Sequence, residues 1–94
     1  MAEVLTYEEI EKKQLELQLE HWQLEDDRLT RKFTFKNFKS ALEFVNKVGE
    51  VAENQKHHPD IAFGWGYANI VTTTHSKGGV TILDLKLAAE IQKI

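Results

Sequence analysis

The sequence predicts an α+β fold in which helices pack on one face of a four-stranded antiparallel sheet, giving two layers. Three observations support this prediction. Two pairs of β-prone segments are each separated by a short turn sequence, other segments carry apolar residues at helical spacing, and capping patterns precede the helices. The predicted order is helix, strand, strand, helix, strand, strand, helix (α-β-β-α-β-β-α). A length of 94 residues favours a single domain over residues 1–94.

Capping residues indicate where the helices begin. Thr6 is followed three residues later by Glu9, which is the capping pattern of a helix start. Thr81 and Asp84 have the same spacing, and Asn37 is available as a cap before the longest apolar-periodic segment. The predicted helices run over about Tyr7–Leu19, Phe38–Gln55 and Ile82–Gln92.

The strands are predicted from alternation, β-branched residues and turn signals. Asp26 and Asp27 mark the first turn, and the Gly64-Trp65-Gly66 sequence marks the second. Arg31 interrupts an apolar alternation, so we expect it near a sheet edge or with its charged end leaning into solvent. The predicted strands are His21–Glu25, Leu29–Phe35, Asp60–Phe63 and Tyr67–Thr74.

A glycine lies inside the longest predicted helix. Gly49 lowers helix propensity by roughly 1 kcal/mol relative to alanine. A glycine in this position suggests that another backbone packs closely against the helix. We therefore expect a close neighbour at Gly49.

Charge and composition exclude several functional classes. A net charge of −3 offers no broad positive surface for phosphate backbones, so direct nucleic-acid binding is not expected. The chain has no cysteine, no signal-peptide pattern at its start and no apolar run of membrane-spanning length. A cytoplasmic protein is expected. Because small domains bury little surface, association into an oligomer is an additional source of stability.

Three of the four histidines lie within nineteen residues of each other. Histidine is the side chain whose ordinary pKa, about 6.5, is nearest to neutral pH, so His57, His58 and His75 suggest a proton-transfer site. Pro59 favours an extended conformation at His58, which points the adjacent imidazoles to opposite sides and gives them different tasks. His75 is expected at the end of the last strand. Hairpin pairing would bring it toward the loop after the long helix, with a cleft between them.

Each candidate side chain also has a purely structural explanation. The loop histidines can be solvated residues without a role, as polar loop residues commonly are. Glu53 lies one helical turn before His57 and can orient an imidazole, but most helical glutamates are only solvated. On pattern alone, Asp84 is expected to cap a helix, and Trp22 and Trp65 are expected to pack rather than to stack on a ligand.

A metal site is not expected from the spacing of the histidines. Three histidines match the ligand number of a catalytic zinc centre. However, adjacent histidines diverge in an extended chain, and no His-x-x-x-His pair lies on a predicted helix. A nucleophilic enzyme is also disfavoured, because the chain has neither cysteine nor a recognisable nucleophile elbow.

Several spaced motifs occur together over most of the chain. They are Glu53-Asn54-Gln55-Lys56-His57-His58-Pro59-Asp60, Tyr67, Thr74-His75, Gly79-Val80-Thr81 and Asp84. This arrangement resembles the signature of the pterin-4a-carbinolamine dehydratase family. Trp22, the Phe33-Thr34-Phe35 strand, the following Lys36-Asn37-Phe38 and the long helix also fall where that family has counterparts. Departures from the family pattern are Ile61 in place of an aromatic residue, the Phe63–Gly66 segment before Tyr67, and Val80 in place of leucine.

The resemblance implies a hydro-lyase that removes water from 4a-hydroxytetrahydropterin during tetrahydrobiopterin recycling, without a metal or organic cofactor. Carried over residue by residue, His57 and His75 become the acid/base pair. His58 places or polarises the pterin, and Glu53 tunes the nearby imidazole. The resemblance also assigns Trp22 to the pocket lining and Asp84 to a supporting role at the helix start.

The resemblance leaves a second class of function open. Some family members resemble partners that stabilise dimeric transcription factors, so the chain is alternatively a non-catalytic protein-binding module. Retention of all three histidines favours catalysis. Family members commonly form homodimers or homotetramers by joining sheets and helices, and exposed apolar positions on the second helix would be consistent with this.

Overall fold

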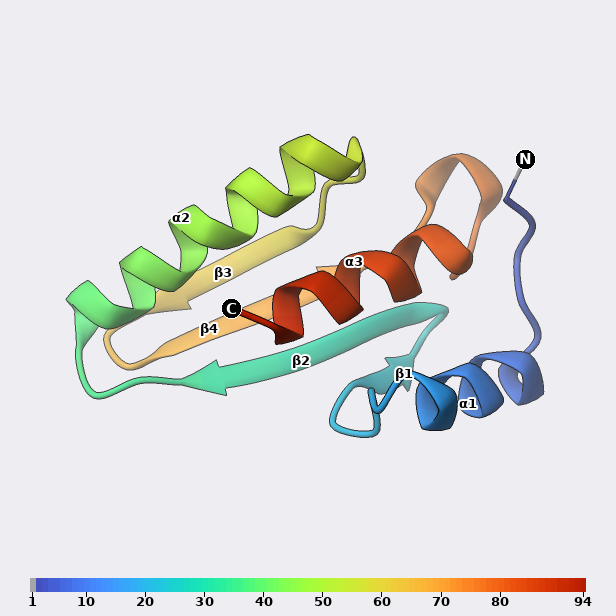
Figure 1. The fold of residues 1–94 in the computed structure, drawn as a ribbon, viewed down its shortest axis with the longest axis horizontal. Helices are drawn as coiled ribbons and strands as arrows, with labels where there is room; N and C mark the ends of the chain where they lie inside the picture. Colours follow the sequence, from blue (N-terminus) through green and yellow to red (C-terminus); the bar gives the residue numbers. More distant parts are fainter. Residues whose placement is uncertain (1) are drawn as a thin grey trace.

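The computed structural model describes residues 2–94 and has the predicted order of elements (Figure 1). The helices are α1 (Tyr7–Glu16), α2 (Phe38–Gln55) and α3 (Ile82–Gln92). The strands are β1 (Gln23–Glu25), β2 (Arg28–Thr34), β3 (Asp60–Gly64) and β4 (Tyr67–Thr72). Helices α2 and α3 lie across the same face of the sheet, and α1 lies beside β1 at one end of the molecule (Figure 1). The predicted α+β class is confirmed.

The sheet is antiparallel throughout and has the strand order β1-β2-β4-β3. β2 and β4 are central, and β4 pairs with β2 along its whole length from Leu29↔Thr72 to Thr34↔Tyr67. β1 pairs only with Arg28–Thr30, so β2 has a free edge from Arg31 onward. Arg31 therefore lies next to an edge, as predicted, and its guanidinium donates to the Gln92 side chain of α3 at 2.7 Å.

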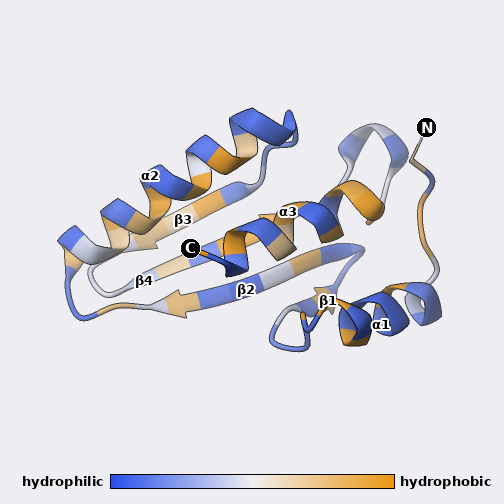
Figure 2. Ribbon diagram, viewed as in Figure 1, coloured by the Kyte–Doolittle hydropathy of each residue, from blue (hydrophilic) through white to orange (hydrophobic). Residues whose placement is uncertain are grey.

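The core lies between the sheet and the two covering helices. Alternate residues of β4, namely Ala68, Ile70 and Thr72, are buried, as the two-residue period of a strand requires. Hydrophobic and hydrophilic blocks alternate along α2 in Figure 2, as expected for a helix with one buried side. The largest fully buried side chains are Trp22, Ile10, Leu19, Leu29, Ile70, Leu85, Leu87 and Ile91.

The predicted helix starts are confirmed by side-chain hydrogen bonds. Thr6 with Glu9, and Thr81 with Asp84, each form a complete capping box. The Asn37 side chain accepts a hydrogen bond from the Ser40 backbone N–H at 2.8 Å. The bounds of α2 and α3 equal the predicted ones because their start signals are local in the sequence.

Helix α1 ends at Glu16, so the predicted extension to Leu19 is wrong. The Gln14 side chain donates to the backbone carbonyls of Leu19 and Trp22, at 3.1 and 2.7 Å, and holds the following segment in a turn. Within that turn, Gln18 has φ 59, a left-handed conformation that ends a helix. The turn places Leu19 in the core, where it is fully buried. A tertiary requirement thus overrides helix propensity at this point.

The close neighbour expected at Gly49 is not found among residues 2–94. A Cβ atom built on Gly49 would meet no heavy atom within 4 Å. Two apolar residues of α2 are also unusually exposed, Phe38 at 47% and Leu42 at 38%. Part of α2 is therefore open on its outer side. None of the helices in residues 2–94 is long and apolar enough to cross a membrane.

Candidate functional site

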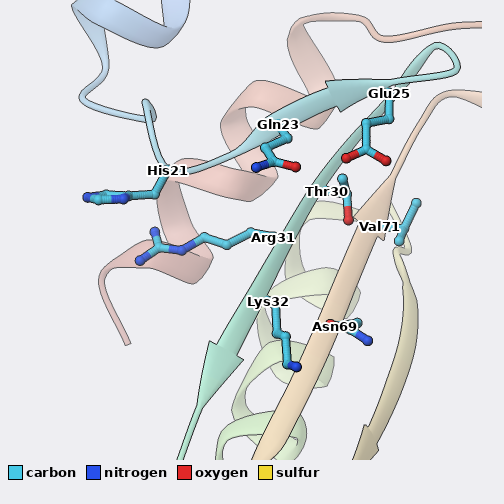
Figure 3. A pocket seen from close by; sticks show the side chains of 8 residues that line it. All are labelled: His21, Gln23, Glu25, Thr30, Arg31, Lys32, Asn69 and Val71. Carbon is cyan, nitrogen blue, oxygen red and sulfur yellow. The ribbon is translucent and has the colours of Figure 1, made fainter.

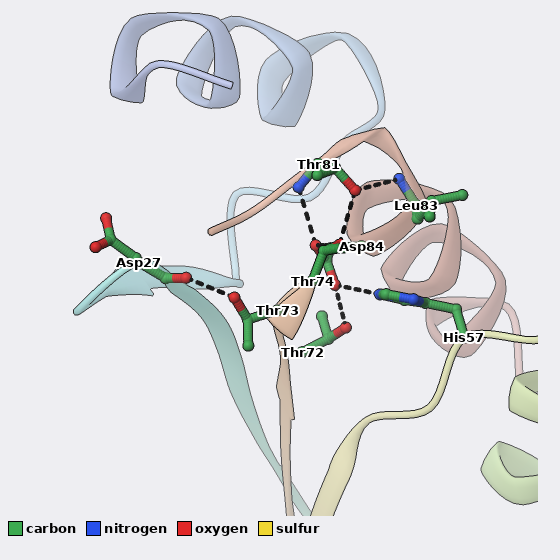
Figure 4. A network of polar contacts seen from close by, with 8 residues as sticks. All are labelled: Asp27, His57, Thr72, Thr73, Thr74, Thr81, Leu83 and Asp84. Carbon is green, nitrogen blue, oxygen red and sulfur yellow. Dashed lines mark hydrogen bonds and ion pairs between the residues drawn. The ribbon is translucent and has the colours of Figure 1, made fainter. Parts of the chain in front are cut away.

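The end of α2 positions His57. After Gln55 the chain turns through Lys56, which adopts the left-handed conformation with φ 54, and the His57 backbone N–H donates to the Ala52 carbonyl at 3.2 Å. This arrangement ends the helix by satisfying its last carbonyls. The loop before β3 follows, as the proline at position 59 predicts. His57 is thereby directed toward the start of α3 (Figure 4).

The His57 imidazole pairs with the carboxylate of Asp84. Nε2 of His57 lies 2.5 Å from Oδ1 of Asp84. The Asp84 side chain is fully buried, and only 12% of the His57 side chain is exposed. A buried carboxylate held against an imidazole can fix the orientation of the ring. The sequence predicted Asp84 as a helix cap, and the structure adds this second contact.

Three further donors surround the Asp84 carboxylate (Figure 4). The Thr72 hydroxyl donates to Oδ1 at 2.5 Å. The Thr74 hydroxyl and the Thr81 backbone N–H donate to Oδ2 at 2.8 and 2.9 Å. With His57, four donors therefore satisfy a carboxylate that is shielded from water. We call these five residues, His57, Thr72, Thr74, Thr81 and Asp84, the Asp84 network.

Sequence reasoning named Thr74 as a motif residue without giving it a role, and it missed Thr72. A signal was present in the alternation of the Thr72-Thr73-Thr74 run, because every second side chain of an extended segment faces the same side. The identity of the group they face could not be read from the run. It lies on α3, ten to twelve residues further along the chain.

His58 and Glu53 form a separate and exposed pair. Nε2 of His58 contacts Oε2 of Glu53, and the two side chains are 63% and 76% exposed. Because solvent screens such a pair, it adds little to stability. The adjacent histidines thus point to different partners, as the extended segment predicts. Glu53 lies against His58, and His57 has Asp84 instead.

His75 does not lie at a strand end, and the prediction of a strand through Thr74 is wrong. β4 ends at Thr72, and His75 opens a short 3-10 helix, η1 (His75–Lys77). The Thr74 backbone N–H donates to the Gly79 carbonyl at 3.0 Å, closing a tight loop. Such a loop needs the Gly78 conformation with φ 77, and this local closure prevents the strand from continuing.

The exposed His75 lines a cavity of about 200 Å³ with residues of the β1–β2 turn. Thr73 ties the two segments together by donating to the backbone carbonyl of Asp27 at 2.9 Å. The Tyr7 hydroxyl donates to the Asp27 carboxylate at 3.1 Å, and this bond raises the pKa of Tyr7. The cavity is lined by Asp26, Asp27, Arg28, Thr73, His75 and Gly78. The structure thus pairs His57 with Asp84, and it places His75 beside the β1–β2 turn.

The two tryptophans have opposite environments. Trp22 is 2% exposed and packs edge-on against Phe33, with ring centroids 5.9 Å apart, as expected of a packing residue. It also lines a cavity of about 250 Å³ with Glu11, Gln14, Leu15 and Glu20. Trp65 is 72% exposed at the β3–β4 turn, so the prediction that it packs is wrong. Trp65 and Gly66 form the two-residue turn between β3 and β4, and the Trp65 side chain lies outside the core.

A larger hollow lies on the sheet face that α2 and α3 leave uncovered (Figure 3). Its volume is about 470 Å³, and charges of both signs surround it. The lining residues are His21, Gln23, Glu25, Thr30, Arg31, Lys32, Asn69 and Val71. None of the predicted site residues is among them. Among residues 2–94, no three side chains of histidine, cysteine, aspartate or glutamate are grouped to hold a metal ion.

Comparisons with known proteins agree with the motif arrangement. Residues 3–94 match the family described as "Pterin 4 alpha carbinolamine dehydratase". A Rubrobacter xylanophilus protein named "Putative pterin-4-alpha-carbinolamine dehydratase" is 49% identical over 88 residues, covering 93% of this chain and 80% of the relative. A Methylococcus capsulatus protein of the same name is 42% identical over 92 residues, covering 96% and 79%.

A solved structure extends the similarity to three dimensions. A crystal structure described as a transcriptional coactivator/pterin dehydratase from Brucella melitensis superposes with a TM-score of 0.86. It is 33% identical to this chain, and the match covers 96% of each protein. The family profile, the identities and the shared fold span nearly the whole sequence. The chain therefore belongs to the pterin 4 alpha carbinolamine dehydratase family.

Proposed function

We propose that the protein removes water from 4a-hydroxytetrahydropterin, using His57 as its principal acid/base group. The observation that carries the proposal is the buried Asp84 carboxylate, which holds Nε2 of His57 at 2.5 Å in a family defined by pterin dehydration. The carbon–oxygen bond at C4a breaks, the hydroxyl takes up a proton and leaves as water, and a ring nitrogen loses a proton as the new double bond forms. Positioned imidazoles can serve both transfers.

We assign the second proton transfer to His75 and substrate placement to His58. His75 is exposed and follows Thr74, whose hydroxyl donates to Asp84, so its backbone is anchored close to the same network. His58 is exposed next to His57, and its contact with Glu53 orients the imidazole. We take the physiological substrate to be the biopterin derivative, so that the reaction serves tetrahydrobiopterin recycling. Trp22 packs against Phe33 and lines a separate cavity, so we give it no direct contact with the pterin.

Dehydration of a freshly generated 4a-hydroxypterin tests the proposal directly. The expected result is an enzyme-dependent rise in the quinonoid product, measured by its absorbance, above the spontaneous rate in the same buffer. His21→Ala is the matched control, because His21 is an exposed histidine beside the hollow on the uncovered sheet face. Wild-type protein that gives no acceleration, but forms a stable complex with a helical partner protein, would instead support the binding-module function.

We also propose that copies of the chain associate into a homodimer or homotetramer through α2. Phe38 and Leu42 expose apolar surface on this helix, and Gly49 leaves room for a close approach. Light scattering should give a molar mass that is twice or four times the 10.9 kDa of one chain. Leu42→Glu should shift the mass toward that of a single chain, because it places a charge in the apolar contact. A single-chain mass for the wild type would contradict the proposal.

A further inference from the structure

The hydrogen bonds of the Asp84 network have fixed directions. An ionised carboxylate only accepts hydrogen bonds, so the Thr72 and Thr74 hydroxyls must both donate to Asp84. The Thr81 backbone N–H donates to Oδ2, because a backbone N–H can act only as a donor. These three donors stabilise the negative charge in a position that water does not reach.

The third threonine hydroxyl completes the chain of donors. Oγ1 of Thr81 accepts from the Leu83 backbone N–H at 3.2 Å and lies 2.8 Å from Oγ1 of Thr74. Since the Thr74 hydrogen is already directed to Asp84, the Thr81 hydroxyl must donate to Thr74. The Thr72 and Thr74 hydroxyls therefore donate to Asp84 directly, and the Thr81 hydroxyl donates to Thr74.

This arrangement determines which nitrogen of His57 carries the hydrogen. With an acceptor opposite it, Nε2 must be the protonated nitrogen of the neutral ring. Nδ1 has no hydrogen-bond partner among the described residues. The only fully buried side-chain nitrogen or oxygen without a partner in residues 2–94 is Trp22 Nε1, so Nδ1 of His57 reaches the surface.

We propose that the Asp84 carboxylate, held by the threonine donors of its network, sets the tautomer of His57 and makes Nδ1 the nitrogen that exchanges a proton with the substrate. Thr72 has a distinct part in this arrangement, because its hydroxyl and Nε2 of His57 share the same carboxylate oxygen. Thr72 is thus a positioning residue, which acts on His57 through Oδ1 of Asp84. The catalytic half of this inference rests on the proposed dehydration, whereas the tautomer is a property of the free protein.

The tautomer can be read without substrate from the nitrogen chemical shifts of ¹⁵N-labelled protein at about pH 9, where histidines are normally neutral. We expect His57 to carry its hydrogen on Nε2, and His21 to show the mixture typical of an exposed histidine. A hydrogen on Nδ1 of His57 would overturn the inference. An inactive wild type with the expected tautomer would contradict the proposed function instead.

Three threonine variants test the positioning role of Thr72. Thr72→Val keeps the shape of the side chain but removes the donor, and Thr72→Ser keeps the donor. Thr30→Val removes a threonine hydroxyl from neighbouring β2, on the uncovered face of the sheet. We expect Thr72→Val to lower kcat about fivefold with little change in KM, the loss corresponding to one hydrogen bond. Thr72→Ser should restore kcat, and Thr30→Val should leave it unchanged.

The proton NMR signal of the His57 Nε2–H provides a second measurement. Its chemical shift would not change if Thr72→Val only lowered the stability of the fold. When Thr72→Val removes one of two donors from Oδ1, that oxygen becomes a stronger acceptor for His57, so the proton signal should shift downfield. Thr72→Ser should keep the wild-type position. An identical signal and an identical kcat in Thr72→Val and Thr30→Val would overturn the role of Thr72. If Thr72→Val does not fold, Thr72→Ser and Thr72→Ala are compared in the same way.

Discussion

Replacing His57 by alanine is expected to slow the dehydration by about 10²- to 10⁴-fold, because one positioned proton-transfer group is removed. The fold should be retained, since three donors still satisfy the Asp84 carboxylate. The lost contact should lower the free energy of unfolding by about 1 to 3 kcal/mol. Initial rates of dehydration and urea unfolding measure the two effects separately.

Two other histidine variants make this result interpretable. His75→Ala is expected to lower the rate as well, because it removes the second transfer group. His21→Ala should keep both the rate and the stability of the wild type. If His57→Ala and His75→Ala both retained the wild-type rate, the acid/base assignment would be wrong even for an active dehydratase.

Asp84→Asn is expected to lower the rate of dehydration by about 10²-fold while the chain still folds. Each carboxylate oxygen accepts two hydrogen bonds, so an amide nitrogen in either place faces two donors. The Thr81 backbone N–H can only donate a hydrogen bond, so the amide oxygen of the variant should occupy the position of Oδ2. The amide N–H₂ then faces the Thr72 hydroxyl and His57, and His57 must move its hydrogen to Nδ1 to accept the amide.

The cost in stability follows from the same geometry. We expect the free energy of unfolding to fall by about 2 kcal/mol, because charge-assisted hydrogen bonds are replaced by weaker ones. Glu16→Gln is the control, since this exposed carboxylate at the end of α1 makes no hydrogen bond or ion pair with any of residues 2–94. Its stability should remain within about 0.5 kcal/mol of the wild type. An Asp84→Asn variant as active and as stable as the wild type would contradict the role of the network.

The features that the sequence predicted correctly depend on neighbouring residues. The starts of α1, α2 and α3 follow from caps three residues from their partners, and alternation identifies the sides of β4. The divergence of His57 and His58 follows from the proline after them. These signals act over one helical turn or one strand pair, so they can be recognised without a three-dimensional structure.

Other features depend on residues that meet only after folding. The early end of α1 results from the Gln14 side chain reaching the carbonyls of a buried turn. The position of His75 results from closure of the loop between Thr74 and Gly79 and from the Thr73 bond to Asp27, 46 residues away. The propensities of single residues describe neither event, because each depends on a specific contact beyond the next turn of the chain, and the position of His75 also depends on a contact 46 residues away.

The histidine cluster shows this division most clearly. The residue types, their spacing and the capping role of Asp84 are readable along the chain, and they were sufficient to indicate the dehydratase family; the proton-transfer role of the histidines stays a prediction. The pairing of His57 with Asp84 spans 27 residues, and Thr72 joins it from the end of β4. Packing of α2 and α3 on one face of the sheet brings these groups together. Because the carboxylate is buried, the loss of any of its hydrogen-bond donors would cost free energy of folding. The order of elements therefore comes from local patterns, whereas the contacts between His57, Asp84 and Thr72 come from the packed fold.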